Sequence, residues 1–171
     1  FTPKLKNILL DQASRGFDWS DISPTIFGAV FESTLNPETR RAGGMHYTSI
    51  ENIHKVIDPL FLDDLKAELE QIKQYKNKKT IEEKAIAFQE KLSNLTFFDP
   101  ACGSGNFLTE TFLSLRRLEN EAIRLRTGGK SLLAVGQADD WIKVSIQQFY
   151  GIEINDFAVS VAKTALWIAE D

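Results

Sequence analysis

The sequence predicts a helix-rich α/β fold. Residues 1–94 are expected to form a helical N-terminal region, and residues 95–171 the first two β-α units of an incomplete parallel sheet. Apolar residues recur at helical spacing before residue 94, which indicates amphipathic helices. Two short runs rich in strand-forming residues, 95–98 and 148–154, are each followed by a helical pattern. A strand, a crossover helix and a second strand are typical of one half of a doubly wound nucleotide-binding fold.

Several helix-start signals divide the N-terminal region. Ser23-Pro24 predicts one helix, because serine is a favoured N-cap and proline suits the first helical position. Thr48 and Glu51 have the spacing of a capping box and predict a second helix. A hairpin of two helices should follow, the second beginning at a capping box from Thr80 to Glu83. The apolar stripes of the hairpin are Leu62, Leu65, Leu69 and Ile72, and then Ile81, Ala85, Phe88 and Leu92.

The pattern changes at residue 95. Residues 95–98 predict a buried strand, and the small residues that follow Asp99-Pro100 predict a tight glycine turn. A long helix is expected from Asn106 to the Gly128-Gly129 pair, and Asn155 is expected to cap a last helix over residues 156–169. Glu153 lies much further along the chain than the roughly 20 residues that follow the glycine turn in a plain nucleotide-binding unit. We therefore expect an insertion in the first crossover.

Composition excludes several classes of protein. The chain has 171 residues, a net charge of -4 and a single cysteine, Cys102. One cysteine excludes an internal disulfide and a cysteine-rich zinc site, and it favours a reducing, cytoplasmic location. His46 and His54 have no companion ligand set, so we expect no metal. No apolar run approaches the about 18 residues of a membrane-spanning helix. The lysine-rich run at residues 76–79 is interpreted as a solvated turn.

The glycine turn and its acidic neighbours indicate a ligand class. Glycine lets the backbone approach a ligand closely, and a helix N-terminus presents unpaired N–H groups. However, Leu108 stands where the dinucleotide fingerprint expects its third glycine, and the Asp99 carboxylate would repel a pyrophosphate. A positively charged ligand such as S-adenosylmethionine fits better. Glu153, at the end of the second strand, is suited to accept hydrogen bonds from both hydroxyls of a ribose.

Three segments resemble the motifs of one enzyme family. Residues 99–105, Asp-Pro-Ala-Cys-Gly-Ser-Gly, resemble the first motif of the amino-methylating DNA methyltransferases of the N6-adenine class. Residues 151–155 resemble the second motif, and residues 44–49 resemble the cofactor motif that comes first in the gamma arrangement of that family. With the helix expected at residues 26–32, the order is most similar to the methyltransferase regions of large single-chain restriction-modification enzymes. The resemblance implies a Rossmann-like, S-adenosylmethionine-dependent fold.

The same resemblance implies roles for individual residues. Asp99 would lie near the methionine ammonium, and Thr48 would hydrogen-bond the methionine carboxylate. Glu153 would take the ribose hydroxyls, and Ile154 would pack against the adenine. The complete set of expected cofactor-binding residues is Tyr47, Thr48, Asp99, Pro100, Ala101, Gly103, Ser104, Gly105, Asn106, Phe107, Glu153 and Ile154.

For some of these residues, a purely structural role is the alternative to cofactor binding. Thr48 would then serve only as a helix N-cap, and Asp99 only as the cap of the glycine turn. Cys102 is expected to be a small packing residue rather than a reactive thiol. Glu153 has no evident structural role at the end of a strand.

The catalytic motif of the family, Asp or Asn followed by Pro-Pro and an aromatic residue, does not occur in these 171 residues. We therefore expect a part of a longer adenine-specific DNA methyltransferase, in keeping with Met45 as the only methionine, and we expect this part to be inactive alone. DNA would contact other regions of the parent, since a net charge of -4 does not suit phosphate binding. The alternatives are a non-catalytic or NAD-type nucleotide-binding module, and a methyltransferase acting on RNA or protein.

Overall fold

The computed structural model describes residues 2–8, 10–11, 24, 48–129 and 141–170. Helix α1 spans Pro3–Asn7, and none of its residues is buried. The helix expected after Pro24 lies outside the described residues, and so does Tyr47. The remaining elements are α4 (Ile50–Ile57), the π-helical turn η2 (Asp58–Leu62), α5 (Asp63–Lys73), α6 (Lys78–Asn94), β1 (Phe97–Asp99), α7 (Asn106–Thr127), the 3-10 turn η4 (Ile146–Gln148), β2 (Phe149–Gly151) and α9 (Asp156–Glu170).

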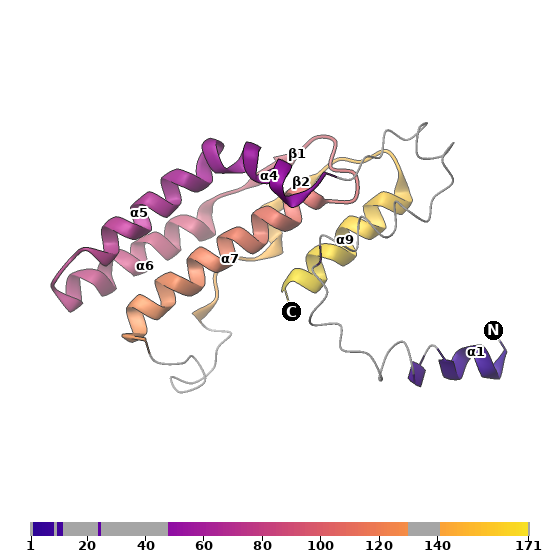
Figure 1. Ribbon diagram of the computed structural model, residues 1–171, viewed down its shortest axis with the longest axis horizontal. Coiled ribbons are helices and arrows are strands. Elements are labelled where there is room, and N and C mark those ends of the chain that lie inside the picture. The colour runs from indigo at the N-terminus through magenta and orange to yellow at the C-terminus, as the bar shows by residue number, and fades with distance from the viewer. Residues whose placement is uncertain (1, 9, 12–23, 25–47, 130–140, 171) are drawn as a thin grey trace.

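The predicted helical hairpin is confirmed: α5 and α6 run side by side (Figure 1). The predicted cap of α6 is wrong, because the helix begins two residues before Thr80. Asn77 is the N-cap, and its side chain accepts hydrogen bonds from the backbone N–H groups of Lys79 at 2.9 Å and Thr80 at 3.4 Å. Asparagine is as good an N-cap as serine or aspartate, so the earlier start is favoured. The lysine-rich run around it is exposed, as expected, but Lys78 and Lys79 are the first residues of α6 rather than part of the turn.

Helix α4 also begins at a neighbouring cap. Ser49, rather than Thr48, is the N-cap, and its hydroxyl accepts a hydrogen bond from the backbone N–H of Asn52 at 3.4 Å. Either hydroxyl residue can cap a helix, so spacing alone did not separate the two. Thr48 is half-buried just before the cap. The role of N-cap, proposed as the structural explanation for Thr48, therefore belongs to Ser49.

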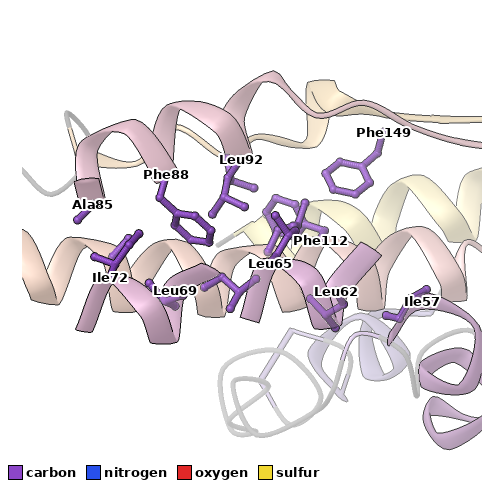
Figure 2. Packing of buried hydrophobic residues seen from close by; sticks show 14 of the residues in the cluster. Ile57, Leu62, Leu65, Leu69, Ile72, Ala85, Phe88, Leu92, Phe112 and Phe149 are labelled. Carbon is purple, nitrogen blue, oxygen red and sulfur yellow. The ribbon is translucent and has the colours of Figure 1, made fainter. Parts of the chain in front are cut away.

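A single hydrophobic core joins the hairpin to α7 and to the sheet. Figure 2 shows side chains of α5 and α6 converging on this core, among them Leu69 and Phe88, each of which is buried. Phe112 of α7 is fully buried and meets the ring of Phe149 edge-on, with 5.5 Å between the ring centroids. The core therefore spans residues on both sides of position 94. Burial of aromatic and branched side chains of this kind is the main source of folding free energy.

The sheet is parallel, as predicted, and pairs β1 with β2 in the described part of the chain. The expectation of a buried first strand is only half right. Phe97 stacks on Phe149, with 5.2 Å between the centroids, whereas Phe98 and its register partner Tyr150 are 62% and 55% exposed. Successive strand side chains point to opposite faces, and the described residues cover one face only.

Helix α7 forms the predicted long crossover helix. It ends at Thr127, and the C-cap residue that follows, Gly128, has a φ of +63° that suits glycine, so the predicted stop is confirmed. The returning chain is attached to α7 by the fully buried Glu119, which accepts hydrogen bonds from the backbone N–H groups of Lys143 at 2.7 Å and Val144 at 3.2 Å. Among residues 2–8, 48–129 and 141–170, no helix is both long enough and apolar enough to span a membrane.

Candidate functional site

The glycine turn lies between the end of β1 and the start of α7, beside the end of β2. The backbone N–H of Ile152 donates to the carbonyl of Asp99 at 3.0 Å, and the N–H of Cys102 donates to the carbonyl of Ile152 at 3.0 Å. These bonds continue the pairing of the strands beyond the last residue of each. The first and second motif segments are thus held side by side at the carboxyl edge of the sheet, where ligands bind in open α/β folds.

Two glycines in the turn have positive φ, and they differ in the space around them. Gly105, with φ of +80°, lies so close to α9 that a Cβ there would be 2.8 Å from the Cβ of Ala162. Gly103, with φ of +53°, has no atom within 4 Å of the position a Cβ would take. Gly105 is therefore needed for packing, whereas the space beside Gly103 is open to a ligand.

Glu153 links the turn to the loop before α9. One carboxylate oxygen accepts a hydrogen bond from the backbone N–H of Gly103 at 3.0 Å, and the other accepts from Asn155 at 2.8 Å. The expectation that Glu153 has no structural role is therefore wrong. The residue is half-buried, and each carboxylate oxygen has more than one acceptor position, so these bonds leave capacity for a ligand.

Asp99 is half-buried at the other side of the turn. Its Oδ1 accepts a hydrogen bond from the backbone N–H of Ala101 at 3.0 Å, which is the turn-capping contact considered from the sequence. Its Oδ2 forms no hydrogen bond with the described residues. Asp99 and Glu153 place two carboxylates around one glycine turn, an arrangement that favours a cation and disfavours a phosphate.

Cys102 is a packing residue. A Cβ at Gly151 would be only 2.7 Å from the Cys102 sulfur, which shows how closely this side chain fits against β2. Burial raises the pKa of the Cys102 thiol, and the nearby carboxylates of Asp99 and Glu153 raise it further. The thiolate is disfavoured, so the geometry does not suit a nucleophile.

Helix α7 begins directly after its N-cap residue, Gly105, which has no side chain to cap the helix. Ser104 and Asn106 are buried there. A mainly apolar pocket of about 270 Å³ lies beside the turn and is bounded by α4, η2, β1 and α7. Three expected site residues line it, Asp99, Pro100 and Phe107.

The remaining expected residues are placed less centrally. Ile154 is 93% exposed just beyond β2, so its side chain has almost no protein contact. Ala101 is exposed on the turn, and Thr48 forms no hydrogen bond with the turn among the residues described. The first-motif segment and Glu153 are therefore brought together, while Thr48 lies just before α4, which packs on α7.

Sequence reasoning missed one contact between these two helices. His54 was considered only as a metal ligand, but its ring lies between Asp58, at 2.9 Å from Nδ1, and Glu110, at 3.2 Å from Nε2. The spacing of four residues between His54 and Asp58 was a local signal for the first contact. The second joins residues far apart in the sequence, and no local signal indicates it.

The chain is similar to DNA methyltransferases over nearly its whole length. The family described as "MmeI, DNA-methyltransferase domain" matches residues 71–171. DNA methyltransferase A of Bacillus subtilis (strain 168) is 39% identical over 170 residues, which cover 99% of this chain and 18% of that protein. A putative type II restriction enzyme and methyltransferase of Methanocaldococcus jannaschii is 26% identical over 180 residues, covering 91% of this chain and 15% of that protein.

A solved structure agrees with these relatives. It shows the type IIL restriction-modification enzyme MmeI in complex with DNA, and it is 46% identical to this chain with a TM-score of 0.80. The match covers 99% of this chain and 21% of the MmeI chain. The chain thus spans about a fifth of the length of the proteins it matches. It belongs to the MmeI DNA-methyltransferase domain family.

Proposed function

We propose that this chain is the S-adenosylmethionine-binding part of an adenine-N6-specific DNA methyltransferase of a restriction-modification system. The observation that carries the proposal is the pair of carboxylates, Asp99 and Glu153, on either side of a glycine turn with open space at Gly103. A cofactor with a positive sulfonium, an ammonium and a ribose matches that charge and those acceptors. Membership of a DNA-methyltransferase domain family supports the same cofactor class.

The residues present fit such a cofactor. The space beside Gly103 leaves room for a ligand, and the acceptor positions of Glu153 that the backbone does not use are available to ribose hydroxyls. Asp99 would hold the ammonium, and the exposed Ile154 would cover the adenine. Thr48 and Tyr47 would hold the methionine carboxylate. Pro100, Ala101, Ser104, Asn106 and Phe107 would shape the walls.

The chemistry divides between this chain and the rest of the protein. When bound, S-adenosylmethionine supplies a methyl group on a positively charged sulfur. The residues of this chain would bind and orient it. In the family that the sequence resembles, an Asp/Asn-Pro-Pro-aromatic motif would hold the adenine extruded from the duplex, and these 171 residues lack that motif. We therefore expect no methyl transfer by this chain alone.

DNA is the proposed partner of the whole protein, because the solved relative is described in complex with DNA. A net charge of -4 indicates that other regions supply most of the phosphate contacts. The proposal includes no metal and no membrane association, and it places the protein in the cytoplasm.

Calorimetric titration tests the cofactor proposal. S-adenosylmethionine and S-adenosylhomocysteine should bind, NAD should not, and Glu153→Gln should weaken binding by about 10-fold, since it removes the charge that accepts the ribose hydrogen bonds. Glu82→Gln, the same change on the exposed surface of α6, is the matched control. Binding of NAD in preference to both methionine derivatives would contradict the proposal.

The target base needs a separate test with the full-length protein. Digestion of DNA methylated with labelled cofactor should release the label as N6-methyladenine. Label on cytosine, or on RNA or protein in place of DNA, would contradict the adenine proposal.

A further inference from the structure

A contact joins α4 to α7 about one turn after the first residue of each helix. Residues proposed to bind the cofactor lie at or just before the start of each of these helices. His54 lies four residues after Ile50, the first residue of α4, and Glu110 lies four residues after Asn106, the first residue of α7. The His54 Nε2 and the Glu110 Oε1 are 3.2 Å apart. This contact therefore links α4, which begins two residues after Thr48, to α7, which begins directly after the glycine turn.

The geometry favours a proton on each ring nitrogen of His54. Nδ1 faces an oxygen of Asp58 at 2.9 Å, while Nε2 faces Glu110. A neutral imidazole has a single N–H, so one nitrogen would direct its lone pair at a carboxylate. With both protons present, each nitrogen donates to an ionised carboxylate, which is the stronger kind of hydrogen bond.

The surroundings favour the charged ring. The side chain of Glu110 is only 2% exposed, and its other charged partner is Arg117 of α7 at 3.1 Å. Asp58 of η2 also accepts from Lys66 of α5 at 3.3 Å. A buried carboxylate that loses a charged partner is strongly destabilising. The hydrogen bond to Asp58 raises the pKa of His54 above its ordinary value, against the opposing effect of burial, and Glu110 raises it further.

We propose that His54, as a doubly protonated imidazolium, is a positioning residue that holds α4 on α7 and so makes cofactor affinity depend on pH. This inference rests on the proposed function, because the segment it positions is the one proposed to hold the methionine carboxylate. His54 does not touch the cofactor in this account. Loss of the ring proton loosens α4, moves Thr48 relative to the turn and weakens binding.

Cofactor affinity measured against pH in the full-length protein tests the coupling. The dissociation constant of S-adenosylhomocysteine should rise by about 5- to 10-fold from about pH 6 to about pH 8.5, as the ring loses its second proton. His54→Gln should bind weakly at every pH and show a flat profile. Lys55→Gln is the matched control, since it removes an exposed cation whose hydrogen bond and ion pair are with Asn52 and Glu51 of the same helix.

A second variant distinguishes the effect of the ring's protonation from a general loss of folded structure. In Glu110→Gln the amide oxygen can take the place of Oε1, which faces both Arg117 and the Nε2 of His54, and it can still accept from both. The negative charge beside the ring is lost, so the ring should lose its second proton at a lower pH. We expect tight binding at low pH and a fall in affinity that begins at a lower pH than in the unchanged protein. A profile at the same pH as that of the unchanged protein would overturn the proposal.

A readout without cofactor distinguishes this inference from the proposed function. Hydrogen–deuterium exchange, corrected for intrinsic pH dependence, should show that α4 of the unchanged protein loses protection by about 5-fold or more as the ring deprotonates. Helix α6 should not, and it reports whether a variant is folded. If the unchanged protein does not bind S-adenosylhomocysteine, the proposed function fails. Hydrogen–deuterium exchange still tests whether His54 holds α4 on α7. Equal pH profiles of α4 protection in the unchanged protein and His54→Gln would overturn the inference.

Discussion

The carboxylate of Glu153 accepts a hydrogen bond of 3.0 Å from the backbone N–H of Gly103, so the end of β2 holds the glycine turn that follows β1. The other carboxylate oxygen accepts from Asn155, which in turn caps α9 through bonds to the N–H groups of Phe157 at 3.0 Å and Ala158 at 3.1 Å. One side chain thus organises the turn and the helix that packs beneath it. A change at Glu153 is therefore expected to alter both the loop and ligand binding.

Glu153→Ala and Glu153→Gln together measure how much the two backbone hydrogen bonds contribute to stability. The alanine leaves the N–H groups of Gly103 and Asn155 without their acceptor, so we expect a loss of about 1–3 kcal/mol in the free energy of unfolding. The glutamine retains one acceptor oxygen and should lose less than half of that. Urea denaturation measures both, with Glu82→Ala as the surface control. Equal stability of all three variants would show that the two hydrogen bonds contribute nothing.

Substitution by alanine should mainly reduce stability at Gly105 and mainly weaken cofactor binding at Gly103. Gly105→Ala places a Cβ 2.8 Å from that of Ala162, in addition to the positive φ, and should cost about 2–4 kcal/mol of stability. Gly103→Ala meets no atom and should cost about 1 kcal/mol, from φ alone. Its methyl group would instead occupy the proposed ligand space and weaken cofactor binding. Thermal unfolding and calorimetry measure the pair, and greater loss of stability at Gly103 would contradict this assignment.

Stability should depend on pH through His54 and Asp58. The folded-state pKa of His54 is raised above 6.5, so its contribution is fully present below about pH 6.5 and is lost as the pH rises through the folded-state value. The pKa of Asp58 is lowered from 3.8, chiefly by the hydrogen bond from His54, so its contribution is present above about pH 3.8 and is lost on acidification. The melting temperature of the unchanged protein should therefore exceed that of His54→Gln most between these limits. A difference that grows above pH 8 would have the wrong sign.

The shared core should be sensitive to a single truncation. Phe112→Ala removes a fully buried ring that packs between the helical hairpin and the sheet, and it should cost about 3–5 kcal/mol. Leu60→Ala, at a side chain that is 71% exposed, is the control and should change stability by less than about 0.5 kcal/mol. Chemical denaturation compares them. A similar small effect for both would show that Phe112 is not part of a cooperative core.

Local signals predicted most of the elements. The hairpin, the long helix ending just before Gly128 and the capping of α9 by Asn155 follow from apolar periodicity and from residues with strong local preferences. The caps at Asn77 and Ser49 were misplaced by one to three residues, because neighbouring polar residues are nearly equivalent as N-caps. Partial exposure of β1 was missed, since a short apolar run does not reveal which of its faces is covered.

The sequence by itself determined the family and the segments that bear the candidate site, because a glycine turn between a strand and a helix and an acidic residue at a strand end are local patterns. Only the tertiary structure decided that Glu153 holds Gly103, and that His54 lies between Asp58 and Glu110. Each of these relationships includes a contact between residues more than 45 positions apart. Such contacts depend on how strands pair and helices pack, and no pattern within either segment encodes them.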